Sequence, residues 1–174
     1  MESARVIITY KCSRNCSYCV NKHKPIRDAA THIQDLSEIP HRNEINITGG
    51  EPMDDPARTF GVLASASALG FKTIYLYTAK WHICLPTMVV GVNGLHFTLH
   101  ADATAEDVAG FHEVQQIACL YPNKSFRLAL DPRLQTPLTL IPRAWTEVWM
   151  KYWRDESDIC IPEHETLYVL GEQS

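Results

Sequence analysis

The chain has 174 residues, of which 45% are apolar and 21% are charged, a composition typical of a globular protein. Its formal net charge of −4 argues against a broad basic face for duplex DNA or an anionic membrane. No apolar run approaches the length of a transmembrane span.

This length predicts a single domain over residues 1–174, with a core of about 5–151 and a C-terminal extension of about 152–174. The N-terminal segment carries an acidic residue and runs directly into a predicted strand, which is unlike a signal peptide. Of the six cysteines, three are crowded into one stretch and three are scattered, unlike a disulfide framework. We therefore expect a protein of the reducing cytoplasm.

Strand-like and helix-like segments alternate along the chain, and this order predicts an α/β fold with a mostly parallel sheet. The predicted strands are 5–10, 44–48, 73–78, 94–100, 125–130 and 146–151, with 165–170 as an additional edge strand. The predicted helices are 28–36, 54–69, 82–91 and 104–120. Five or six strand–helix units are too few to close an eight-stranded barrel. We expect an open, partial (βα)5–6 barrel.

Three cysteines, Cys12, Cys16 and Cys19, follow the first predicted strand within eight residues. Thiolates are soft ligands that select zinc, copper(I) or iron–sulfur clusters. Structural zinc and the usual 4Fe–4S cluster take four protein ligands, so three cysteines leave one coordination position for another ligand. The alternative is a zinc site completed by His23 or Cys84. We expect the scattered Cys84, Cys119 and Cys160 to be buried structural thiols.

The spacing Cys-x3-Cys-x2-Cys, with Tyr18 before the third cysteine, resembles the signature of the radical S-adenosylmethionine (radical SAM) superfamily. A second segment, Gly49-Gly50-Glu51 after the strand 44–48, looks like the Gly-Gly-Glu element of the same superfamily. The resemblance implies an oxygen-sensitive 4Fe–4S cluster held by the three cysteines, with S-adenosylmethionine (SAM) on the fourth iron. It also implies reductive cleavage of SAM to a 5′-deoxyadenosyl radical that abstracts hydrogen from an organic substrate.

In this reading, Gly49 and Gly50 let a ligand approach the backbone closely, and the Glu51 carboxylate accepts hydrogen bonds from the SAM ammonium group. An ordinary strand-to-helix turn is the alternative interpretation of these three residues. Ligands of such folds bind at the carboxyl ends of the strands. This rule nominates residues that follow three of the strands: Thr78, Lys80, His100, Asp102 and Asp131.

Alternation along the strand 125–130 directs Arg127 into the barrel, where it can pair with a carboxylate of SAM or substrate. Each of these nominated residues is alternatively a solvated loop residue or part of a structural ion pair. In the strand 146–151, Glu147, Trp149 and Lys151 share one face, and the pattern leaves open whether that face lines the lumen.

Five basic residues lie in or beside the cysteine stretch: Lys11, Arg14, Lys22, Lys24 and Arg27. They fit an acidic electron donor of the flavodoxin or ferredoxin type, a phosphate-bearing substrate, or a solvated loop. We expect a small-molecule substrate, nucleotide-like as a first hypothesis. The alternatives are a glycyl-radical activating enzyme acting on a large partner protein, a non-catalytic iron–sulfur electron-transfer or sensor protein, and a zinc-stabilised interaction module.

Overall fold

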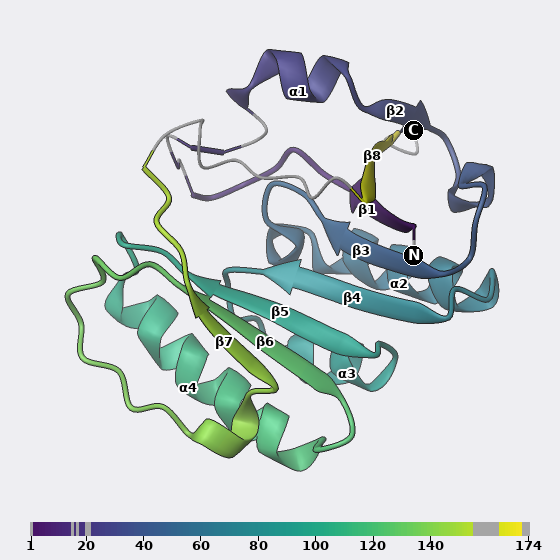
Figure 1. Ribbon diagram of the computed structural model, residues 1–174. Helices are drawn as coiled ribbons and strands as arrows, with labels where there is room; N and C mark the ends of the chain where they lie inside the picture. The colour runs from purple at the N-terminus through teal and green to yellow at the C-terminus, as the bar shows by residue number, and fades with distance from the viewer. Residues whose placement is uncertain (1, 15, 17, 20–21, 155–163, 172–174) are drawn as a thin grey trace.

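The computed structural model describes residues 2–14, 16, 18–19, 22–154 and 164–171. In this part of the chain eight strands form one sheet, in which all neighbours are parallel, in the order β2-β8-β1-β3-β4-β5-β6-β7 (Figure 1). The strands are β1 (Ser3–Ile7), β2 (Thr31–Ile33), β3 (Glu44–Thr48), β4 (Thr73–Thr78), β5 (Gly94–Leu99), β6 (Ser125–Leu130), β7 (Glu147–Met150) and β8 (Glu165–Leu170). The helices are α1 (Lys24–Asp28), α2 (Pro56–Ala68), α3 (Leu85–Val90) and α4 (Ala105–Leu120), with 3-10 turns η2 (Leu36–Glu38), η3 (Pro52–Asp54) and η4 (Pro142–Ala144).

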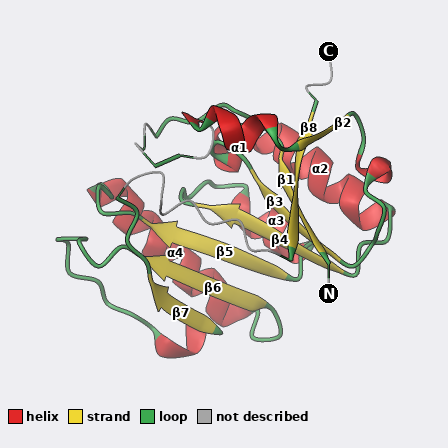
Figure 2. Cartoon of the chain, turned by 45° about the horizontal axis from the view of Figure 1, so that its top comes forward, coloured by secondary structure: helices red, strands yellow, loops and turns green. Residues whose placement is uncertain are grey.

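The prediction of an open α/β fold is confirmed, because β2 and β7 form two separate edges of the sheet. From β3 to β6, consecutive strands lie side by side, and α2, α3 and α4 connect them. Parallel crossovers are almost always right-handed, so a sheet that grows in one direction carries its connecting helices on one side. Figure 2 shows these helices together on that side. No helix among the described residues is long and apolar enough to cross a membrane.

The helix boundaries follow local chemistry that is visible in the sequence. The Asp55 side chain caps α2 by accepting a hydrogen bond from the Arg58 amide, and Pro56 occupies the first turn. Gly70 follows α2 with a φ of 78°, the left-handed conformation that favours glycine. Thr104 and Asp107 form a capping box at the start of α4. The helices predicted over 54–69 and 104–120 are confirmed as α2 and α4, with ends that differ by at most two residues.

Two secondary-structure predictions are wrong, one for the last strand and one for the segment 28–36. The segment β8 is not an edge strand, because it lies between β1 and β2 and pairs with both. The C-terminal extension therefore contributes to the sheet. The segment 28–36 is not one helix, because the chain forms α1, then β2, and then turns into η2. A three-residue strand beside β8 depends on a partner more than 130 residues away, which local periodicity cannot reveal.

The two faces of the sheet have different side chains. The outer face, under the helices, is apolar and includes Val6, Ile45, Ile47, Leu76, Leu95, Phe97 and Leu128, all at most 1% exposed. The inner face carries the alternate residues of the same strands. Many of these are polar or aromatic, and they include Arg5, Asn46, Tyr77, His96, Arg127 and Trp149.

Candidate functional site

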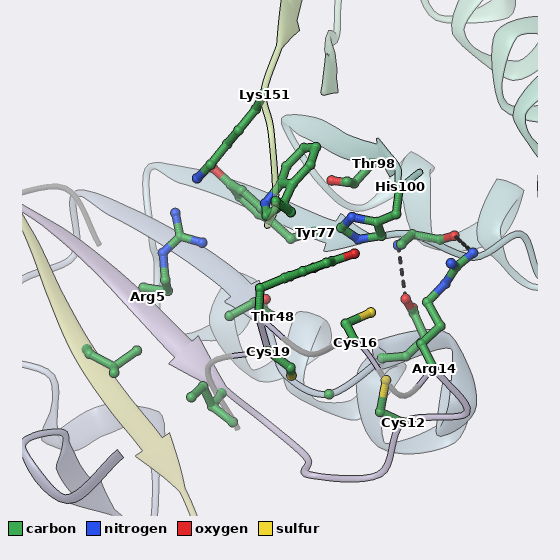
Figure 3. Close-up of a pocket in the computed structure, with 17 residues that line it drawn as sticks. Arg5, Cys12, Arg14, Cys16, Cys19, Thr48, Tyr77, Thr98, His100 and Lys151 are labelled. Carbon is green, nitrogen blue, oxygen red and sulfur yellow. Dashed lines mark hydrogen bonds between the residues drawn. The ribbon is translucent and has the colours of Figure 1, made fainter. Parts of the chain in front are cut away.

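The three cysteines lie in the loop that follows β1, at the carboxyl edge of the sheet. Cys12, Cys16 and Cys19 are partly buried, form no disulfide, and line one pocket of about 250 Å³. Figure 3 shows them next to one another on the wall of this pocket. Residues of β1, β3, β4, β5 and β8 line the same pocket, so the sheet curves around it.

The backbone of the cysteine loop rests directly on the Gly49–Gly50 segment. The Gly50 amide donates to the Thr9 carbonyl at 2.7 Å, and the Glu51 amide donates to the Lys11 carbonyl at 2.9 Å. A Cβ atom on Gly50 would lie 2.1 Å from the Lys11 oxygen, far inside contact distance. Gly50 therefore has no room for a side chain, because the backbone of the cysteine loop lies against it. The sequence had predicted that a ligand, rather than this loop, approaches the glycines.

Side chains clamp the cysteine loop to the next strands. The guanidinium of Arg14 is ion-paired with Asp107 at the start of α4, is 3.8 Å from Asp102, and donates to the Ala79 carbonyl at 3.2 Å. Lys80 donates to Asp54 at 2.6 Å.

On the other side of this clamp, both the amide and the hydroxyl of Ser13 bond to the carboxylate of Asp54. The hydrogen bond to Asp54 raises the pKa of Lys80. Burial raises the pKa of Asp54, but the bonds from Lys80 and Ser13 outweigh burial, and the net pKa is lower than usual.

The thiols themselves are held in an environment that disfavours free thiolates. Burial raises the pKa of Cys12 to about 11, and the charges of Cys19 and Glu51 add to this shift. Burial also raises the pKa of Cys16. The raised pKa of Cys12 and Cys16 favours the protonated thiol over the thiolate unless a cation replaces the proton, as metal binding requires. The site is therefore poorly suited to nucleophilic catalysis by a free thiolate.

The donor set fits a 4Fe–4S cluster with three protein ligands. Among the described residues no group of three or more His, Cys, Asp or Glu side chains is close enough to hold a single metal ion. The thiolates of a cluster bind different irons and so lie further apart than the ligands of one ion. Three cysteines, with no fourth among the described residues of the pocket lining, are the donor set that a cluster with one open position needs, whereas a closed zinc site would need a histidine as its fourth ligand.

Glu51 is buried, with 2% of its surface exposed, and lies at the pocket wall. Its carboxylate accepts hydrogen bonds from the Met53 amide, the Thr78 hydroxyl and the Ala79 amide. Burial raises the pKa of Glu51, and these bonds only partly offset the rise. A carboxylate has about four acceptor positions, so one position remains for a ligand, while the bonds from Thr78 and Ala79 hold the segment after β3 against the end of β4.

Aromatic rings border the cysteines. The centre of the Tyr18 ring lies 5.3 Å from that of His100 and 6.5 Å from that of Trp153. His100 also meets Trp153 edge-on at 4.9 Å. Burial, together with the charge of Arg14, lowers the pKa of His100 to about 4. Tyr18 and His100 thus line the pocket beside the cysteines, as the sequence analysis proposed for cofactor-binding residues.

Other predicted residues are not themselves part of the pocket lining. Thr78 faces Glu51, and Lys80 faces Asp54 and Ser13 in a neighbouring hollow. Arg127 does lie on the inner face, over the Tyr75 ring at 4.1 Å and 3.8 Å from Glu147, but below the pocket lining. Asp131 binds Arg133 and the Trp153 amide, and Asp102 faces Arg14.

The scattered cysteines were predicted to be buried, and this prediction is wrong for one of them. Cys84 is exposed rather than buried, because it sits in the turn that begins α3. Cys119 is partly buried. Cys160 lies outside the described residues, as do most of the acidic residues near the C-terminus.

Sequence reasoning missed several pocket residues that come from strand interiors. Arg5 from β1, Thr48 from β3, Tyr77 from β4 and Thr98 from β5 all line the pocket. A signal was present for Arg5 and Thr98, because each is a polar residue between two apolar neighbours in a buried strand. The sequence pattern did not decide which face of the strand 146–151 lines the pocket. It is the face of Trp149 and Lys151, since Lys151 lines the pocket and Trp149 contacts His96.

The fold and the pocket define an α/β protein with an all-parallel sheet and a three-cysteine pocket at its carboxyl edge. No protein-family model matches the chain, and no curated protein is significantly similar to it in sequence.

Proposed function

We propose that this protein is a radical SAM enzyme that binds a 4Fe–4S cluster through Cys12, Cys16 and Cys19. The observation that carries the proposal is the convergence of these three thiols, with Gly50 and Glu51, on one pocket. Two motifs that are about 30 residues apart in the sequence therefore meet in space. An open partial barrel of the radical SAM type agrees with the curved parallel sheet and its one-sided helices.

When bound, a reduced cluster and SAM supply a 5′-deoxyadenosyl radical that abstracts hydrogen from an organic substrate. The chain's own residues position and shield this chemistry. Arg14, Ser13 and Lys80 hold the cysteine loop against β4 and α4. The remaining acceptor position of Glu51 suits the ammonium group of SAM. Tyr18, His100 and Trp153 exclude water from one side of the pocket.

The physiological electron donor is proposed to be a flavodoxin or ferredoxin, and the substrate a small, nucleotide-like molecule. Several basic residues beside the cysteines pair with carboxylates of the same chain, so less positive charge is available to bind an acidic electron-donor protein. Lys11 pairs with Asp55 at 3.5 Å, Lys24 pairs with Asp28 at 3.4 Å, and Arg14 pairs with Asp107. Charge complementarity with an acidic donor is therefore weaker support than the pocket itself.

The test is anaerobic reconstitution with iron and sulfide, followed by dithionite, SAM and an assay for 5′-deoxyadenosine. We expect about four irons per chain and formation of 5′-deoxyadenosine by the native protein. In Cys16→Ala we expect product at background level. The matched control is Cys84→Ala, because Cys84 is exposed and outside the pocket, and this variant should retain activity.

The same assay separates the alternatives. A reducible cluster without SAM cleavage would support the electron-transfer or sensor hypothesis and overturn the enzyme. Zinc in place of iron would support the interaction module. Cleavage that requires a large partner protein, on which a glycyl radical then forms, would support the activating-enzyme hypothesis.

A further inference from the structure

Below the cysteines, the pocket extends toward the inner face of the sheet. Its lining there includes Arg5 of β1, Tyr77 of β4 and Lys151, which directly follows β7. The Arg5 guanidinium lies 4.7 Å from the centre of the Tyr77 ring. Figure 3 shows Arg5 and Lys151 extending toward Tyr77 from different walls of the pocket. Two cationic groups from opposite arms of the sheet therefore face one space.

The cationic residues of this inner face differ in whether they pair with a carboxylate. Arg5 pairs with Glu165, whose side chain is only 5% exposed. Arg127 lies 3.8 Å from Glu147. Within the described part of the chain, the Lys151 ammonium has no ion pair, and it lies over the Trp153 ring, 5.6 Å from its centre. Lys151 is thus a cationic residue of the pocket lining that no described carboxylate pairs with.

His96 lies on the same face, beside Tyr77 and outside the pocket lining. Its ring stacks on Tyr77 at 4.3 Å and meets Trp149 edge-on at 5.1 Å. It is 9% exposed, and its Nδ1 atom is buried without a hydrogen-bond partner among the described residues. Burial, together with the charges of Arg5, Arg127 and Lys151, lowers its pKa to about 3. The imidazole is neutral at pH 7 and adds no charge of its own.

Arg5 retains hydrogen-bonding capacity despite its carboxylate partner. A guanidinium has five N–H donors, and Glu165 accepts from Nε and Nη2. The Nη1 donors are left for another acceptor. A carboxylate or phosphate that also met Lys151 would form charge-assisted bonds with both residues, the strongest class of hydrogen bond in proteins.

The site of Arg5 is separated from the site proposed for the amino group of SAM. Arg5 is level with Asn46 in the sheet, and Asn46 precedes Gly50 by four residues. The strand β3 ends at Thr48, so Gly50 lies beyond its carboxyl end, whereas Arg5 is level with a residue inside the strand. The ammonium and carboxylate of SAM share one carbon atom, so a SAM held through its ammonium at Glu51 has both groups near the carboxyl end of the sheet.

We propose that the pocket binds an anionic group of the substrate, a carboxylate or a phosphate, between Lys151 and Arg5 and beside Tyr77. This inference rests on the proposed function in that the anion belongs to the substrate of the same pocket. The unpaired Lys151 attracts the anion, and Arg5, fixed by Glu165, orients it.

The test measures anion binding directly by calorimetry on the full chain, reconstituted anaerobically and without SAM. The probes are inorganic phosphate and benzoate, with sodium chloride as the control for ionic strength. We expect one of the two anions to bind, and this anion identifies the substrate group. In Lys151→Met we expect roughly tenfold weaker binding or worse, since a hydrogen bond to a charged group contributes about 1.5–3 kcal/mol.

Two further variants make this result interpretable. Lys151→Arg restores the charge and should recover most of the affinity. Lys72→Met removes an exposed lysine before the amino end of β4 and should bind like the native protein. The proposal is overturned if neither anion binds, or if Lys151→Met binds as tightly as the native protein.

The two proposals fail in different ways. Lys151-dependent anion binding without SAM cleavage would reject the radical SAM function and leave the anion site in place. SAM cleavage by a protein that binds neither probe would reject the anion site and leave the radical SAM function in place.

Discussion

The outer and inner faces of the sheet are built from alternate residues of the same strands, yet their side chains differ in kind. On the outer face, Ile47 and Phe97 are fully buried among other apolar side chains. On the inner face, Asn46 and His96 are also buried, but the Asn46 Oδ1 and the His96 Nδ1 atoms lack hydrogen-bond partners within the described residues.

An unpaired buried polar atom costs about 1–3 kcal/mol, whereas burying a large apolar side chain contributes about 1.5–3 kcal/mol. The outer face therefore stabilises the fold, and the inner face gives up stability. Polar atoms that are costly in the free protein are useful where a ligand completes their bonds. The comparison teaches that stability and binding reside on opposite faces of one sheet.

The largest effect is expected on the outer face. Phe97→Ala removes a fully buried ring from β5 and should lower the free energy of unfolding by about 3–5 kcal/mol. The matched control is Thr98→Ala, the next residue on the same strand, which faces the pocket and should cost less than about 1 kcal/mol. Urea denaturation of the two variants measures both values. Equal losses would contradict the division between the faces.

A smaller effect is expected where the cysteine loop meets β3. Gly50→Ala places a Cβ atom 2.1 Å from the Lys11 oxygen, so the loop must move. We expect a loss of about 1–3 kcal/mol in stability and loss of most of the iron bound after reconstitution. Gly61→Ala, in α2 with nothing within 4 Å of the added atom, should bind iron normally and gain about 0.5–1 kcal/mol. Normal iron binding by Gly50→Ala would show that the contact does not position the cysteines.

The smallest change at neutral pH is expected for a buried histidine of the inner face. The pKa of His96 is lowered to about 3 in the folded protein, against an ordinary value of about 6.5. Between these values the unfolded chain binds the proton and the folded protein does not, so native stability falls as pH decreases from 6.5 toward 3. His96→Phe should change stability at pH 7 by less than about 1 kcal/mol.

Below pH 6.5, the free energy of unfolding should decrease less steeply with falling pH in His96→Phe than in the native protein, by up to about 1.4 kcal/mol per pH unit. Denaturation series at pH 7, 6, 5 and 4 measure this slope. His32→Gln, at an exposed position of β2, is the control for loss of a histidine without loss of burial. A slope in His96→Phe that equals the native slope would show that His96 is not the group that titrates.

Much of the candidate site could be predicted because its chemistry is local in sequence. The spacing of Cys12, Cys16 and Cys19 places three ligands in one loop, and the caps at Asp55 and Thr104 set where α2 and α4 begin. Lys80 could not be assigned in this way. Its position after β4 indicated a ligand contact, but its ammonium reaches Asp54, and such a choice between partners depends on where two separate loops meet.

The sequence by itself determined the alternation of strands and helices, the parallel sheet and the placement of three thiols in one loop, because these depend on periodicity and on neighbours within a few residues. Only the tertiary structure decided that β8 lies between β1 and β2, that Arg5 meets Glu165 across 160 positions of the chain, and that Lys151 turns into the pocket. Each of these depends on pairing between distant segments. Such pairing is selected by the packing of the whole sheet, and no local pattern of residues encodes it.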